Sequence, residues 1–308
     1  MKTLLLLMFL QTSPSYEAVK ERGFEEVLSR IYNHTRLLEA DQEAEKMARS
    51  LLEKYPDDPY TYTIWASIEW LLIGRELNLK ADEQKDIRKI RGYENRTKQY
   101  RELVNKGLAL TENKTDEKSL FLRAALQFDH AKFSARYEGG FGGLDKADKE
   151  AAEGLKIAKI ILAQKPNFCS AYFFLGGSRL QFSTKVPWYK KPFVWGISRA
   201  YKELYNLDGD VINEKKSIEW LERVYHCGFP QPWLKKVWLE TNFVLVGAYD
   251  NFDKKHSPKE EMDTLLKEVP LLQKLSSLFP QNQDLAQRRS DKEARLQVLQ
   301  KTILKQKK

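Results

Sequence analysis

Residues 41–72 contain the clearest structural signal in the chain and read DQEAEKMARSLLEKYPDDPYTYTIWASIEWLL. In the first part, apolar residues recur at i, i+3, i+4, i+7 and i+8, namely at Ala44, Met47, Ala48, Leu51 and Leu52. This spacing places them on one face of a helix. Pro56 and Pro59 then interrupt the pattern, and an aromatic, apolar run follows at once. The segment predicts two helices joined by a tight turn.

The same order of apolar helix, turn and second helix recurs along the chain. Further turns lie at 165–168, 228–230 and 279–282, and 100–110 pairs with 120–133. These segments follow the helical period, and alternating runs typical of strands are essentially absent. With 42% hydrophobic residues among 308, the chain has ample material for a core, which excludes wholesale disorder. We therefore expect an all-α fold.

Small residues and prolines take corresponding positions in two of these units. One unit has Ala44, Ala48, Leu51 and Pro56 before Tyr62, Trp65 and Ala66, and another has Lys165-Pro166-Asn167 before Tyr172, Leu175 and Gly176. Over roughly residues 36–290 the chain resembles tetratricopeptide-repeat proteins. The resemblance implies an α-solenoid of helical hairpins that acts as an interaction scaffold. The spacing of the turn prolines predicts that the array is irregular. The prolines at 56, 166, 230 and 280 are 110, 64 and 50 residues apart, whereas the usual period is about 34.

Residues 1–15 have the order of a secretory signal peptide. A charged start precedes the apolar run 4–10, and small residues follow at Ser13 and Ser15. We expect this segment to be removed, leaving 16–308 as a single domain that is exported and periplasmic or cell-envelope associated. No later apolar run approaches the roughly 20 residues that cross a bilayer, so an integral membrane protein is not expected. The alternative is an apolar first helix of a cytoplasmic protein.

Cysteine and histidine are scarce. The only cysteines, Cys169 and Cys227, lie at comparable places in successive units. One bridge is therefore possible, although we expect two unpaired thiols. The histidines are His34, His130, His226 and His256. None has another histidine or a cysteine at metal-ligand spacing, so we expect no metal site and no cofactor.

Two local motifs could suggest catalysis or nucleotide binding. In each of the adjacent pairs Asp129-His130 and His226-Cys227, the two side chains would point about 100° apart on a helix. This geometry separates a nucleophile from its base. The stretch 136–144 has four glycines within five positions, but it lacks the Gly-Lys-Ser/Thr ending of a phosphate loop. Close helix packing or a sharp bend explains these glycines better. We therefore expect no enzyme activity.

The formal net charge of +9 has two local sources. The C-terminal residues 288–308 carry eight Lys and Arg against two acidic residues, which gives +6. A basic terminal helix that caps the last hairpin is expected here, and peripheral contact with an anionic membrane is the alternative. The second source interleaves cations with aromatic rings, at Lys185, Trp188, Tyr189, Lys190, Lys191, Phe193, Trp195, Arg199 and Tyr201. Aromatic rings beside cations are typical of binding surfaces, so we predict partner binding there, and filling of a gap between hairpins is the alternative.

Taken together, the patterns predict a non-enzymatic scaffold that binds a protein or peptide in the bacterial envelope. The alternative is a solute- or lipid-binding accessory of an envelope transport or assembly system, with a pocket under the aromatic segment. Nucleic acid is not an expected partner of an exported protein. A scaffold should show a long polar groove, whereas a small-molecule or lipid carrier should show an enclosed apolar pocket.

Overall fold

The computed structural model describes residues 16–33, 38–79, 83–184, 196–209, 213–253 and 257–306. Within these ranges the regular structure is helical and contains no strand, which confirms the all-α prediction. The predicted signal peptide, residues 1–15, lies outside the described residues. The elements are α2 (Tyr16–Asn33), α3 (Leu38–Lys54), α4 (Pro59–Glu76), η1 (Ile87–Lys89), α5 (Arg96–Ala109), α6 (Glu117–Tyr137), α7 (Gly140–Gln164), η2 (Cys169–Ala171), α8 (Tyr172–Thr184), α10 (Arg199–Asp208), α11 (Glu214–Cys227), η4 (Pro232–Leu234), α12 (Lys235–Asp253), α13 (Pro258–Leu278) and α14 (Gln283–Gln306).

The hairpin expected from residues 41–72 is formed by α3 and α4. Ala44 and Ala48 are buried, as the apolar stripe of α3 predicts. After the turn, the Asp58 carboxylate accepts a hydrogen bond from the backbone N–H of Tyr60 at 2.9 Å, and Pro59 occupies the first turn of α4. Both are favourable features of a helix start, because they satisfy or remove otherwise unpaired backbone donors.

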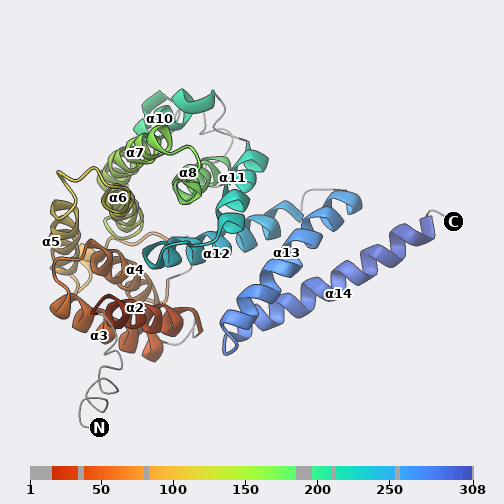
Figure 1. Ribbon diagram of the computed structural model, residues 1–308, viewed down its shortest axis with the longest axis horizontal. Helices are drawn as coiled ribbons and strands as arrows, with labels where there is room; N and C mark the ends of the chain where they lie inside the picture. Colours follow the sequence, from red (N-terminus) through yellow and green to blue (C-terminus); the bar gives the residue numbers. More distant parts are fainter. Residues whose placement is uncertain are drawn as a thin grey trace, which may run out of the picture.

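The helices from α3 to α11 follow an arc, and α12 lies across its open side (Figure 1). Helix α12 and the turn between α13 and α14 contact the first described helix, α2. The rings of Tyr32 on α2 and Phe243 on α12 stack at 5.0 Å, and the Asn282 amide donates to the Tyr32 carbonyl at 2.7 Å. Packed helical hairpins are compatible with a helical-repeat fold. These contacts between sequence-distant helices go beyond the nearest-neighbour contacts of a simple array, so the solenoid stays a prediction.

Most residues of helix α12 are buried or half-buried, and the charged side chain of Lys236 is buried with them. Lys236 donates to Asp129 of α6 at 3.0 Å and lies 3.3 Å from Glu240. Lys132 of α6 contacts the same two carboxylates, Glu240 at 3.1 Å and Asp129 at 3.4 Å. These four residues, here called the α6–α12 ion cluster, alternate in sign. Because Lys132 and Lys236 lie so close to Glu240, its pKa is lowered to about 2 although burial acts in the opposite direction.

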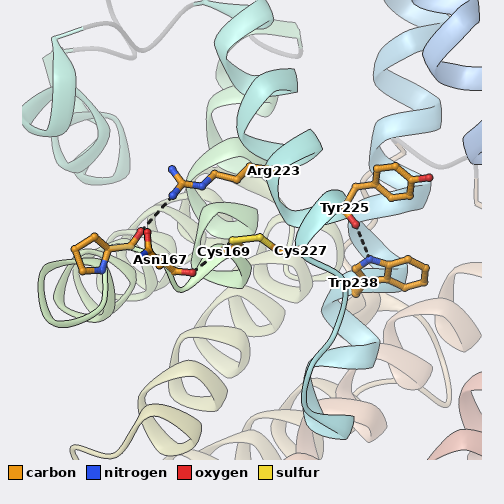
Figure 2. Close-up of a disulfide and its surroundings, with 7 residues drawn as sticks. Asn167, Cys169, Arg223, Tyr225, Cys227 and Trp238 are labelled. Atoms are coloured by element: carbon orange, nitrogen blue, oxygen red, sulfur yellow. Dashed lines mark hydrogen bonds between the residues drawn. A yellow bond between two sulfur atoms is a disulfide. The ribbon is translucent and has the colours of Figure 1, made fainter.

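Cys169 and Cys227 form a disulfide, so the expectation of two unpaired thiols was wrong (Figure 2). Their Cα atoms are 6.2 Å apart. Helix α8 packs along α11, and this brings η2, at the start of α8, beside the last residue of α11. The Arg223 guanidinium strengthens the same junction, since it lies 4.3 Å from the centre of the Tyr172 ring.

The C-terminal helix α14 packs on α13, and the pair projects away from the arc (Figure 1). Four of the basic residues in 288–308 have carboxylate partners, which reduces the charge available to a membrane. The pairs are Arg288–Asp250, Arg289–Glu293, Lys292–Asp250, Lys292–Glu268 and Arg295–Glu261. Within the described part of the chain, no helix is both long and apolar enough to cross a membrane.

Candidate functional site

The predicted aromatic and basic binding residues are only partly described. Lys185, Trp188, Tyr189, Lys190, Lys191, Phe193 and Trp195 lie outside the described residues. Of the other two, Tyr201 is buried between the rings of Phe182 and Tyr205, so it packs within the fold. Arg199 is about half exposed and pairs with Asp145 of α7 at 2.9 Å. The described end of this segment therefore anchors α10 on α7.

A polar hollow of about 310 Å³ lies between α5 and the α6–α7 junction. Five of its residues come from one face of α5, because 97, 101 and 105, and likewise 98 and 102, are one helical turn apart. The opposite side is contributed by η1, the turn after α6, and α7. Its lining is Arg88, Glu94, Thr97, Lys98, Arg101, Glu102, Asn105, Glu138 and Lys146. Every one of these side chains is charged or polar, so the hollow can hydrogen-bond a ligand from several directions.

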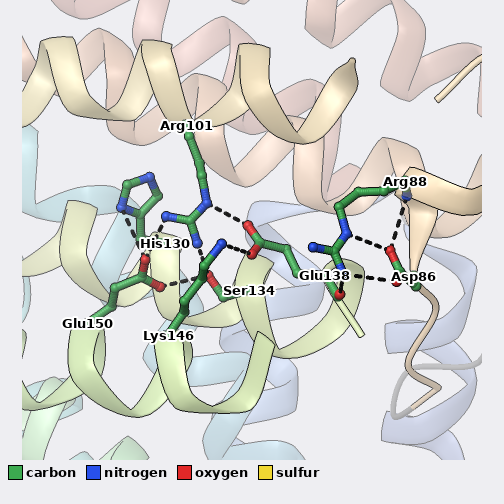
Figure 3. Close-up of polar contacts among 8 residues, drawn as sticks. All are labelled: Asp86, Arg88, Arg101, His130, Ser134, Glu138, Lys146 and Glu150. Carbon is green, nitrogen blue, oxygen red and sulfur yellow. Dashed lines mark hydrogen bonds and ion pairs between the residues drawn. The ribbon is translucent and has the colours of Figure 1, made fainter. Parts of the chain in front are cut away.

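Arg101 organises the floor of the hollow (Figure 3). Its Nε donates to Glu138 at 2.5 Å, and its two terminal nitrogens donate to Glu150 at 2.9 Å and to Ser134 Oγ at 2.7 Å. The Ser134 hydroxyl donates in turn to Glu150 at 2.7 Å. Because α5, α6 and α7 each contribute to it, the network fixes the walls of the hollow relative to one another.

The two carboxylates that Arg101 bridges have opposite pKa shifts. Burial acts to raise the pKa of Glu138, but hydrogen bonds from Arg101 and Lys146 outweigh it and lower that pKa overall. At Glu150 burial dominates and raises the pKa, although Ser134 and Arg101 oppose it. Glu138 is therefore a stable anion, and its charge is neutralised by its two cationic partners.

His130 and Ser134 lie beside Glu150, but they do not form a nucleophile and its base. Ser134 is fully buried, and its hydroxyl donates to Glu150 instead of His130. His130 Nδ1 is 3.8 Å from Glu150. Burial, and secondarily the charge of Arg101, lowers the pKa of His130 to about 4, so the imidazole is neutral near pH 7. The arrangement is suited to holding three helices together, and its buried hydroxyl is poorly placed to attack a substrate.

The neutral His130 should make stability fall in acid. Its pKa is about 4 in the folded chain against an ordinary value of 6.5, so the unfolded chain binds the proton first as the pH falls. The neutral imidazole therefore contributes to the free energy of unfolding above pH 6.5. This contribution, about 3 kcal/mol in all, is lost as the pH falls towards 4. Urea unfolding of the native chain and of His130→Gln across this range measures it. The difference between the two chains should shrink with falling pH, and a constant difference would contradict the assignment.

The glycine-rich stretch forms the turn from α6 into α7, as the expected bend or close packing predicts. Gly139 and Gly140 have φ values of 63° and 60°, which side-chain-bearing residues rarely adopt. A Cβ on Gly139 would lie 2.6 Å from the Cβ of Asp86, and one on Gly143 would lie 2.8 Å from the Ser134 carbonyl oxygen. These glycines let the segment before η1 and the start of α7 approach the end of α6.

Among the described residues, no group of three or more His, Cys, Asp and Glu side chains is arranged to hold a metal ion. Comparisons with protein-family models, curated proteins and solved structures found no match to the chain. The polar hollow was missed in the sequence, because Thr97, Arg101 and Asn105 read as an ordinary solvated helix face. Their one-turn spacing was the only local signal.

Proposed function

We propose that the chain is a non-enzymatic scaffold that binds a protein or peptide partner at the polar hollow. The observation that carries this proposal is the hydroxyl of Thr97, which lines the hollow. Thr97 is 7% exposed, and its Oγ1 has no hydrogen-bond partner within the described part of the chain. A buried hydroxyl without a partner costs about 1–3 kcal/mol, and a polar ligand would remove that cost.

The lining of the hollow favours a peptide over a lipid. Arg88, Lys98 and Lys146 offer donors, while Glu102 and Asn105 offer acceptors, so the N–H and C=O groups of a peptide could both be satisfied. An apolar carrier pocket would need mainly hydrophobic walls. The volume of the polar hollow, about 310 Å³, suits a short polar segment of a partner.

Two observations support a location in the bacterial envelope. Disulfides persist mainly in oxidising compartments such as the periplasm, and the two cysteines of this chain form one. The charged, apolar and small-residue order of residues 1–15 is typical of export. We accordingly propose that the scaffold is exported and that its tetratricopeptide-like hairpins present the hollow to an envelope partner.

Thr97→Val should weaken partner capture about fivefold to tenfold without lowering stability, because it removes one hydrogen bond and keeps the shape. Partners retained from native envelope extract by the tagged chain are quantified by mass spectrometry. Thr302→Val on the exposed face of α14 is the matched control, since its hydroxyl donates only to the Val298 carbonyl of its own helix. Equal capture by all three chains would reject the polar hollow as the binding site.

A further inference from the structure

The turn between α6 and α7 lies beside a cation-rich segment that precedes α5. The Lys85 N–H donates to the Arg136 carbonyl at 2.7 Å. The Arg88 guanidinium donates to the Glu138 carbonyl (Figure 3). The close approach of Gly139 to Asp86 continues this contact. Residues 85–91 and the start of α7 therefore share one edge of the molecule.

The start of α7 exposes apolar side chains at this edge. Phe141 is 87% exposed, and Leu144, one turn further on, is 45% exposed. On either side of Phe141, a Cβ added to Gly140 or Gly142 would meet nothing within 4 Å. The ring therefore stands on a convex surface, and Phe141 and Leu144 together expose apolar side chains to solvent at this edge.

The charges beside the ring are mainly positive. Lys85, Arg88, Lys89 and Arg91 are all exposed, and the one acidic residue among residues 85–91, Asp86, lies 2.7 Å from Arg88 and 3.6 Å from Lys89. The nearby acids of α7 are partly neutralised, because Asp145 pairs with Arg199 and Asp148 accepts hydrogen bonds from Ser198 and from the backbone N–H of Arg199. Glu83 and Glu94, just outside this range, are exposed. We call Lys85, Arg88, Lys89, Arg91, Phe141 and Leu144 the basic edge.

We propose that the basic edge seats the protein on an anionic lipid surface. Cations near such a surface are attracted to lipid headgroups, and an aromatic ring inserts where headgroups meet acyl chains. The protruding ring of Phe141 can insert into a fluid lipid surface without a preformed pocket, whereas a protein partner would have to supply a fitted pocket for the ring. The proposed membrane contact uses residues 85–91 and the start of α7. It is therefore distinct from membrane contact through the basic tail, residues 288–308.

Sedimentation with lipid vesicles tests the basic edge. Vesicles of equal parts phosphatidylglycerol and phosphatidylcholine should bind the native chain at low salt, and pure phosphatidylcholine vesicles should bind it far less. Lys89→Gln with Arg91→Gln should reduce binding about thirtyfold, and Phe141→Ala about tenfold. The matched controls are Tyr205→Ala, an exposed ring on α10, and Lys301→Gln on α14. Circular dichroism melts should show that all variants remain folded.

Three results would overturn the proposal. The first is equal binding to anionic and neutral vesicles by the native chain. The second is a loss with Lys301→Gln as large as that of the double variant, which would assign binding to the tail. The third is stronger binding to polyglutamate than to the anionic vesicles, which would identify an acidic protein as the partner. The vesicle measurement is independent of partner capture at Thr97, so either proposal can fail alone.

Discussion

Replacing Cys169 and Cys227 by serine should lower the free energy of unfolding by about 4 kcal/mol. The bridge joins residues 58 positions apart, so it removes much of the conformational freedom of the unfolded chain. For a closed loop of this length, the chain-entropy relation gives about 4 kcal/mol. The folded junction keeps its other contacts, including the Arg223 guanidinium over the Tyr172 ring. The variant should therefore fold with the same helix content and unfold at lower urea.

Urea unfolding with and without a reducing agent measures this effect. Reductant should shift the native chain to the midpoint of the double serine variant and leave that variant unchanged. Because the sequence contains no third cysteine, a mispaired disulfide within the chain cannot confuse the result. Coincident unfolding of the oxidised and reduced native chain would show that the bridge contributes nothing to stability.

Lys236→Met should destabilise the chain by about 3–5 kcal/mol, because it leaves buried carboxylates without one of their cations. The side chains of Lys236 and Asp129 are 3% and 4% exposed, so water replaces little of the lost interaction. Lys132 retains its contacts with both carboxylates, and its pKa is raised by Glu240 and Asp129 against the effect of burial. The cluster joins α6 to α12, so its loss should also loosen α12 across the arc.

The neighbouring residue supplies the matched control. Lys235 pairs with Glu25 at 2.6 Å, but both side chains are partly exposed. Lys235→Met should cost less than about 1 kcal/mol, as is usual for such pairs. Thermal and urea unfolding of the two variants compare these values directly. Equal losses at Lys235 and Lys236 would contradict the view that burial makes the α6–α12 ion cluster important.

Local patterns were sufficient for the helices, and tertiary contacts account for most of what was missed. The α3–α4 hairpin follows from apolar spacing and the Pro56 turn, both of which lie within a few residues. The burial of Lys236 does not follow from the local sequence, because a lysine beside apolar residues is expected to be solvated. Glu240 lies one turn further along α12, but the other partner, Asp129, comes from α6, which is distant in the sequence. The pairing of Cys169 with Cys227 likewise depends on how α8 lies along α11.

The same distinction explains the candidate site. Cations and aromatic rings alternate within residues 185–201, and this pattern predicts a binding surface. The described ring of Tyr201, however, packs inside the fold. The polar hollow combines Arg101 with Glu138, which lies 37 positions away. No short stretch of sequence contains that combination, so the hollow could not be inferred from the sequence.

Site-specific photo-crosslinking tests the central proposal most directly. A photoreactive residue replaces Asn105, an exposed residue in the wall of the polar hollow, and Lys301 on α14 is the control position. Each chain is illuminated in native envelopes, and its crosslinked products are identified by mass spectrometry. We predict a defined protein crosslinked from position 105, absent from position 301 and reduced by Thr97→Val. Identical products from both positions, or no product from position 105, would contradict partner binding at the polar hollow.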